Sequence, residues 1–181
     1  DINELDIEAK VLLLQLEIPL ETVIHAAKWG KQKGMIVILN PAPACELSDE
    51  LIANADYIIP NETELNLLTG VPVTDIASAE QAAKVLLQRG AKNVIVTLGS
   101  KGALLVSGHQ VKQVDVYKVN VVDTTAAGDA FIGGFASYFL TLESDSSLSD
   151  VQEQADVLQI VEAVKYANAC GALAATKFGA Q

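Results

Sequence analysis

Short apolar runs alternate along the chain with longer amphipathic segments. Val11–Leu16, Met35–Leu39 and Asn93–Leu98 are apolar along nearly their whole length, and the helical pattern of Leu20–Lys33 follows the first of them. Strands that lack polar alternation are buried on both faces, and such strands separated by helices are typical of a parallel sheet. We therefore predict an α/β fold, with a mostly parallel sheet flanked by helices on both faces in three layers.

The remaining elements continue this pattern. Further strands are predicted at Tyr57–Ile59 and Ala103–Val106, and the alternating, valine-rich stretch Val111–Val122 suits antiparallel edge strands. A short helix opens near Ser48, and Ser78 is the predicted cap of a longer one. The other predicted helices are Glu62–Leu68, Ser78–Arg89, Ala127–Phe139 and Val151–Ala175, and the Ser- and Asp-rich stretch Leu142–Asp150 is a predicted loop. Because no internal repeat or interdomain linker is visible, residues 1–181 are predicted to form a single domain.

Charge and cysteine content narrow the function classes. The 181 residues carry a formal net charge of -11 and only 12 basic residues, whereas nucleic-acid binding needs clustered Lys and Arg. We therefore expect no nucleic-acid partner. No apolar run reaches the roughly 18 residues of a membrane span, so no membrane partner is expected. Cys45 and Cys170 lie far apart without metal-ligand spacing, which favours a reducing cytoplasm over a zinc site or a disulfide framework.

The segment Asp123–Asp129, D-T-T-A-A-G-D, carries the strongest chemical signal. It places two carboxylates around small residues where a predicted strand leads into a predicted helix. Small side chains let a phosphate approach the backbone, and the N–H groups at a helix start bind anions. Asp129, in the first turn, is suited to accept a proton from a hydroxyl that attacks a phosphate. A carboxylate that only balances the helix dipole fits the same residues equally well.

The longer string D-T-T-A-A-G-D-A-F closely resembles the D-T-x-x-x-G-D signature of the ribokinase-like sugar kinases, the PfkB family. The resemblance implies that Asp129 is the general base and contacts the sugar hydroxyl. It also implies that Ala126, Ala127 and Gly128 form an anion hole for the transferred phosphoryl group. Asn40–Ala44, N-P-A-P-A, resembles a loop of the same family, although a proline-stiffened turn explains it as well.

Two further segments repeat the resemblance in the family's order. The string N-E-T-E matches the N-x-x-E motif, which implies that Asn61 and Glu64 lie near Mg²⁺ and the nucleotide phosphates; an Asn cap followed by acidic first-turn residues is the alternative. The string T-L-G-S-K-G matches the T-x-G-x-x-G turn that contacts ATP, here through Thr97, Gly99 and Gly102. Gly-rich turns between strands are common, so this turn alone is a weak signal.

The end of the chain also fits the family. Asn168 matches a position that lines the adenine pocket, with a solvated helix residue as the alternative. The resemblance further implies a monovalent cation, K⁺ or similar. Its ligands would be Asp123 and backbone carbonyls near Thr125, Lys177 and Gly179, although Asp123 also suits a turn cap. Glu17 matches a residue that touches the sugar, and a loop carboxylate is the alternative for it.

Taken together, the resemblance implies ATP-dependent phosphorylation of a sugar hydroxymethyl group, with D-ribose giving ribose 5-phosphate. The alternatives are another kinase of the family, acting on fructose, a nucleoside or a deoxyribose, and a non-catalytic nucleotide-binding module. The chain starts at Asp1 without Met, and it matches only the C-terminal, nucleotide-binding part of the family. We therefore expect a fragment that binds nucleotide weakly without turning over sugar. Its parent is expected to be a homodimer formed through a β lid that this sequence lacks.

Overall fold

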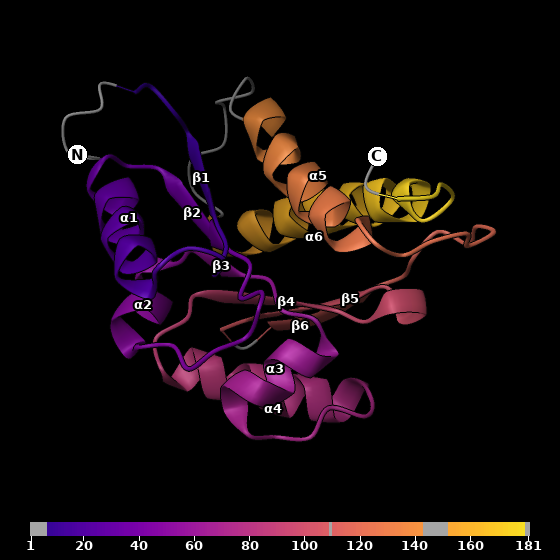
Figure 1. Cartoon of the computed structure of the whole chain (residues 1–181), viewed down its shortest axis with the longest axis horizontal. Coiled ribbons are helices and arrows are strands. Elements are labelled where there is room, and N and C mark those ends of the chain that lie inside the picture. Colours follow the sequence, from indigo (N-terminus) through magenta and orange to yellow (C-terminus); the bar gives the residue numbers. More distant parts are fainter. Residues whose placement is uncertain (1–6, 109, 143–151, 180–181) are drawn as a thin grey trace. The chain divides into compact units, whose positions relative to one another are not determined.

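Figure 1 shows the computed structural model, which describes residues 7–108, 110–142 and 152–179. The chain divides into two compact units. Unit 1 comprises Asp1–Val96 and Leu104–Val111, and unit 2 comprises Thr97–Ala103 and Lys112–Gln181. The single domain expected from the sequence stays a prediction.

Six strands in the described residues form one sheet. They are β1 (Val11–Leu14), β2 (Ile36–Leu39), β3 (Tyr57–Ile58), β4 (Asn93–Thr97), β5 (Ala103–Ser107) and β6 (Gln110–Val114), in the spatial order β1-β2-β3-β4-β5-β6. β1 to β4 pair in parallel, with Leu13 opposite Ile38 and Tyr57 opposite Asn93. The links from β4 to β5 and from β5 to β6 are only a few residues long, and such short links join antiparallel neighbours. The predicted α/β class, mostly parallel with antiparallel strands, is confirmed.

The predicted strand region Val111–Val122 is wrong beyond Val114, where β6 ends. Val121 and Val122 are exposed, with 63% and 45% of their surface open to solvent. The N–H groups of Val122 and Asp123 donate to the carbonyl of Ala175, at 2.8 and 3.2 Å. These residues therefore dock on the end of a helix, which satisfies the donors that a strand partner would otherwise take.

Unit 1 contains four α-helices among its described residues. They are α1 (Leu20–Gln32), α2 (Asp49–Asn54), α3 (Glu62–Thr69) and α4 (Ile76–Gln88). Ser48 caps α2 as expected, because its side chain accepts the N–H of Leu51. The predicted cap of α4 is wrong: Asp75 is the N-cap, and Ser78 is the third residue of the resulting capping box. The carboxylate of Asp75 accepts the N–H of Ser78 at 2.8 Å, so the helix starts earlier than predicted.

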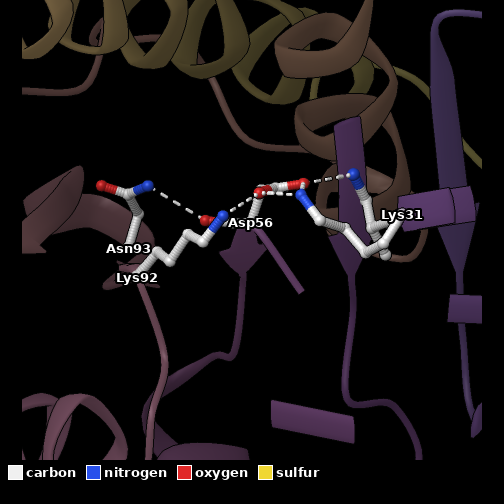
Figure 2. A network of polar contacts seen from close by, with 5 residues as sticks. Lys31, Asp56, Lys92 and Asn93 are labelled. Carbon is white, nitrogen blue, oxygen red and sulfur yellow. Dashed lines mark hydrogen bonds and ion pairs between the residues drawn. The ribbon is translucent and has the colours of Figure 1, made fainter. Parts of the chain in front are cut away.

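One carboxylate of unit 1 ties three segments together (Figure 2). Asp56, just before β3, accepts two hydrogen bonds from the ammonium of Lys31 on α1, at 2.6 and 2.8 Å, and one from Lys92 at 3.0 Å. Its Oδ2 also accepts the N–H of Val37 in β2 at 2.9 Å, and Asn93 donates to its carbonyl at 3.0 Å. Asp56 thus fixes the starts of three neighbouring strands to α1.

Two long helices dominate unit 2. They are α5 (Ala127–Leu142) and α6 (Gln152–Ala174), which lie side by side in Figure 1. Phe135 of α5 and Ala163, Val164 and Ala167 of α6 are buried. The predicted bounds are confirmed to within a few residues, although α5 runs on to Leu142. Residues 143–150 of the predicted loop lie outside the described residues.

Candidate functional site

The candidate site residues fall into two groups. Glu17, Asn61 and Glu64 belong to unit 1. The others all belong to unit 2: Thr97, Gly99, Gly102, Asp123, Thr125, Ala126, Ala127, Gly128, Asp129, Asn168, Lys177 and Gly179. Unit 2 therefore contains the proposed base, anion hole, cation loop and nucleotide turn within one compact body.

The D-T-T-A-A-G-D segment leads directly into α5, as the sequence predicts. Ala127 is the first helical residue, and its N–H donates to the carbonyl of Thr124 at 3.1 Å. Within the described residues, the N–H groups of Ala126, Gly128 and Asp129 make no hydrogen bond. Helix starts leave such donors open, and they favour an anion. The N–H groups of Ala126 and Gly128 are thus open to an anion, while the N–H of Ala127 is already engaged.

Asp129 lies in the first turn of α5 with an exposed side chain. No hydrogen bond to its carboxylate comes from any residue that the structure describes. A carboxylate that is not tied to a neighbour, beside open N–H donors, is free to meet a hydroxyl held at the same place. The geometry thus permits the role of general base.

Asp123 organises the loop before α5. Its Oδ1 accepts the N–H of Thr125 at 2.9 Å and the hydroxyl of Thr125 at 2.6 Å, and its Oδ2 accepts the N–H of Gly179 at 3.0 Å. The hydroxyl of Thr125, the N–H of Gly179 and the N–H of Thr125, in that order, lower the pKa of Asp123 to about 2. The N–H of Lys177 donates to the carbonyl of Ala174 at 3.1 Å. The sequence suggested either a cation ligand or a turn cap for Asp123, and the structure shows the turn cap. Thr125 and Gly179 lie beside it.

The predicted nucleotide turn packs against the end of β6. Gly99 and Gly102 have φ of +55° and +85°, and a Cβ added to Gly102 would lie 2.1 Å from the carbonyl oxygen of Val114. Thr97 ends β4 immediately before this turn. Because no side chain fits at Gly102, the turn lies directly against the backbone of residues 114–116.

Asn168 is buried, with 4% of its surface exposed, so the interpretation as a solvated residue is wrong. Its Nδ2 donates to the carbonyls of Val114 and Asp115, at 3.2 and 3.1 Å. A pocket of about 370 Å³ is lined by this same stretch and by α6: Gln113, Val114, Asp115, Val116, Tyr117, Val161 and Lys165. Asn168 therefore braces one wall of a pocket with apolar, aromatic and charged lining.

In unit 1, Asn61 and Glu64 form a capping box at the start of α3. The N–H of Asn61 donates to Glu64 Oε2, the side-chain amide of Asn61 donates to Oε1, and the N–H of Glu64 donates to Asn61 Oδ1, each at 2.8 Å. Partial burial raises the pKa of Glu64, although the hydrogen bond from Asn61 opposes that rise. The capping interpretation of this pair is confirmed, and its two side chains lie in contact.

Asn40 is a residue to which the sequence analysis gave no role of its own. It is buried, its Nδ2 donates to the carbonyl of Ile59 at 3.0 Å, and its N–H donates to the carbonyl of Leu14 at 2.9 Å. The N–H of Leu16 donates to the carbonyl of Ala42 at 3.0 Å, just before the exposed Glu17. The N-P-A-P-A loop thus holds the chain next to Glu17 and next to Asn61. An Asn at the end of a buried strand was the available signal.

The ligand atoms that the Asp123 loop and Glu64 offer limit which metal ions each could bind. The described residues contain no cluster of three or more His, Cys, Asp or Glu side chains able to hold a metal ion. The Asp123 loop offers one carboxylate among backbone groups, which suits a weakly held monovalent ion with oxygen ligands. Glu64, paired with Asn61, suits Mg²⁺ that is held mainly by phosphate oxygens. In the described part of the chain, no helix has the length and apolar character needed to span a membrane.

Comparisons with known proteins show which family the chain belongs to. The family model described as "pfkB family carbohydrate kinase" matches residues 2–181. Deoxyribokinase of Salmonella typhi is 48% identical over 134 residues, which are 74% of this chain and 44% of that protein. Ribokinase of Haemophilus influenzae is 41% identical over 174 residues, 96% of this chain and 52% of that protein.

A solved structure gives the same result. The Arabidopsis thaliana ribokinase complexed with ribose and ATP matches with a TM-score of 0.81 and 35% identity, covering 95% of this chain and 51% of that one. The chain thus spans about half the length of the relatives that it matches. The fold, the D-T-T-A-A-G-D helix start and these matches agree, and the chain belongs to the pfkB family of carbohydrate kinases.

Proposed function

We propose that this chain is the nucleotide- and phosphoryl-binding part of a kinase that transfers the γ-phosphoryl group of ATP to a sugar hydroxymethyl group. The observation that carries the proposal is the start of α5. There, the exposed carboxylate of Asp129 stands beside the N–H groups of Ala126 and Gly128, which make no hydrogen bond within the described residues. An anion-binding helix start and an available base in the same turn are what phosphoryl transfer to a hydroxyl requires.

In the proposed reaction, the carboxylate of Asp129 accepts the proton of the attacking hydroxyl. The N–H groups of Ala126 and Gly128 donate to the phosphoryl oxygens, where negative charge develops. Asn61 and Glu64 are proposed to act near Mg²⁺, which when bound neutralises the phosphate charge. The capping box keeps the carboxylate of Glu64 in one orientation.

The nucleotide is proposed to lie along the turn formed by Thr97, Gly99 and Gly102. Its adenine is proposed to enter the pocket that Asn168 braces. The backbone of residues 114–117 forms one wall of that pocket, and Val161 and Lys165 of α6 line it too. Asn168 is proposed to position the backbone that lines the pocket, because its Nδ2 donates to the carbonyls of Val114 and Asp115.

A K⁺-like ion is proposed beside the anion hole, held by Asp123 and by carbonyls near Thr125, Lys177 and Gly179. Two observations support it: the pKa of Asp123 is lowered to about 2, and its carboxylate joins the Thr125 turn to Gly179 by accepting an N–H from each. The carboxylate of Asp123 stays ionised at every physiological pH, so it can attract a cation bound there throughout that range. The role proposed for Glu17, contact with the sugar, is supported by its exposed position beside the N-P-A-P-A loop.

The proposed acceptor is D-ribose. A second candidate, a deoxyribose, is favoured by the 48% identity to a deoxyribokinase. Rates with ribose and 2-deoxyribose, measured on the longer protein that contains this chain, separate the two. Homodimerisation through a lid segment and a cytoplasmic location are proposed for that longer protein as well.

Calorimetric titration of the 181-residue chain with Mg²⁺-ATP in K⁺ buffer, with and without ribose, tests the nucleotide half of the proposal. We expect weak ATP binding that is indifferent to ribose. A folded chain that binds no ATP would refute the proposed function. In the longer protein, Asp129→Ala is expected to lower kcat by about 10²–10⁴-fold, the usual contribution of a general base, with ATP affinity little changed. Glu80→Ala, which alters a surface pair with Lys84 on α4, is the matched control.

A further inference from the structure

Gly171 of α6 faces the first residue of α5. A Cβ added at Gly171 would lie 3.0 Å from the carbonyl oxygen of Ala127 and 3.6 Å from Cβ of Phe131. A contact of 3.0 Å is tighter than almost all real Cβ contacts, so any side chain at position 171 would displace that carbonyl by a few tenths of an ångström. The missing side chain lets α6 lie directly against the start of α5.

The carbonyl that Gly171 touches belongs to the same peptide unit as the N–H of Gly128. A peptide unit is planar and moves as one body, so displacing its oxygen tilts its N–H. That N–H is one of the donors that makes no hydrogen bond within the described residues. The contact at Gly171 therefore determines where an anion-hole donor points.

The same end of α6 also holds the segment that precedes the anion hole. The carbonyl of Ala175 accepts the N–H groups of Val122 and Asp123, and the N–H of Gly179 donates to the carboxylate of Asp123. The stretch from Gly171 to Gly179 thus contacts both sides of the segment that contains Ala126 and Gly128.

We propose that Gly171 is a positioning residue for the phosphoryl site: by lacking a side chain, it lets α6 set the direction of the Gly128 N–H. The inference rests on the proposed function, which gives that N–H its ligand. Catalytic constellations must be held to within about 0.5 Å, and a displacement of a few tenths of an ångström takes up much of that tolerance before the tilt of the N–H is added.

Gly171→Ala in the 181-residue chain is the test, with ATP and AMP as probes. We expect ATP affinity to fall about tenfold, the cost of one charge-assisted hydrogen bond, and AMP affinity to stay within about twofold. Gly133→Ala, on α5 with no atom within 4 Å of the added Cβ, is the matched control. Equal losses of ATP and AMP affinity in Gly171→Ala would overturn the proposal.

A second readout needs no nucleotide. In amide NMR spectra, Gly171→Ala should shift the resonances of residues 126–129 well beyond the shifts that Gly133→Ala causes there. Unshifted resonances would overturn the proposal, whether or not the wild-type chain binds ATP. Failure of the wild-type chain to bind ATP would refute the proposed function but not the positioning role of Gly171. If Gly171→Ala does not fold, inorganic phosphate is titrated into the wild-type chain. The Gly171 amide should then shift together with that of Gly128, and a Gly171 amide that stays fixed while Gly128 shifts would overturn the proposal.

Discussion

Replacing Asp56 by alanine removes the acceptor shared by α1, β2 and the start of β4. The N–H of Val37, on a residue with no exposed surface, then has no acceptor, and an orphaned buried donor costs about 1–3 kcal/mol. The pairs with Lys31 and Lys92 add little, because these side chains are 29% and 55% exposed and water can solvate them. We therefore expect Asp56→Ala to lower the free energy of unfolding by about 1–4 kcal/mol.

Urea unfolding followed by circular dichroism measures this change. Asp56→Asn, which keeps an acceptor for Val37, should lose about half as much as Asp56→Ala. Asp49→Ala, which removes an ion pair to Arg89 from a side chain that is 73% exposed, is the control and should stay within about 0.5 kcal/mol of wild type. A loss in Asp56→Ala no larger than in this control would refute the reasoning.

The pH dependence supplies an independent check on Asp56. Burial alone would raise its pKa, but hydrogen bonds from Lys31, the Val37 N–H and Lys92 outweigh burial, so the pKa lies below its usual 3.8. A carboxyl with a lowered folded pKa stabilises the fold above its unfolded pKa, and that stability is lost as the pH falls through the folded pKa. The stability difference between wild type and Asp56→Asn should therefore be constant above about pH 5 and shrink below about pH 4. A difference that does not change between these pH values contradicts the assignment.

Three further perturbations follow from the site. Gly102→Ala should destabilise the chain by about 3 kcal/mol or more, because the residue has a positive φ and the added Cβ would meet the Val114 carbonyl at 2.1 Å; a thermal melt within a degree of wild type would contradict this. Asn168→Ala should cost about 1–3 kcal/mol in urea unfolding, because two carbonyls lose their donor, and it should also weaken ATP binding in calorimetry. Asp123→Asn should abolish any preference of ATP binding for K⁺ over Na⁺, and it should also lower the melting temperature, because the amide nitrogen cannot accept the N–H of Thr125 or Gly179 that faces it; an unaltered preference would remove Asp123 from the cation site.

The sheet could be predicted from the sequence because its strands are apolar along their length. β2, β3, β4 and β5 start or end within a residue or two of the predicted bounds. The prediction was wrong at Val121 and Val122, where apolar residues lie exposed and their backbone docks on α6 instead of pairing as a strand. Local composition carries no information about such a partner, which lies more than fifty residues away along the chain.

The candidate site, like the sheet, contains positions that the sequence predicts and positions that it does not. The placement of Asp129 in the first turn of α5 could be predicted, because it depends on a local helix start. The burial of Asn168 could not, since its acceptors at Val114 and Asp115 lie 54 and 53 residues away. The role proposed for Gly171 could not be predicted from the sequence either, because it depends on the close approach of α5 and α6.

The path of the chain between the two units constrains how this protein is made. The chain passes from unit 1 to unit 2 after Val96, returns after Ala103 and leaves again after Val111. Neither unit is therefore a continuous stretch of sequence, and no single cut yields two self-contained pieces. On the ribosome, unit 1 has to wait for residues 104–111, and unit 2 has to wait until α6 emerges. Because each unit needs a segment that lies beyond part of the other, we expect neither unit to fold or to be exchanged as a separate module.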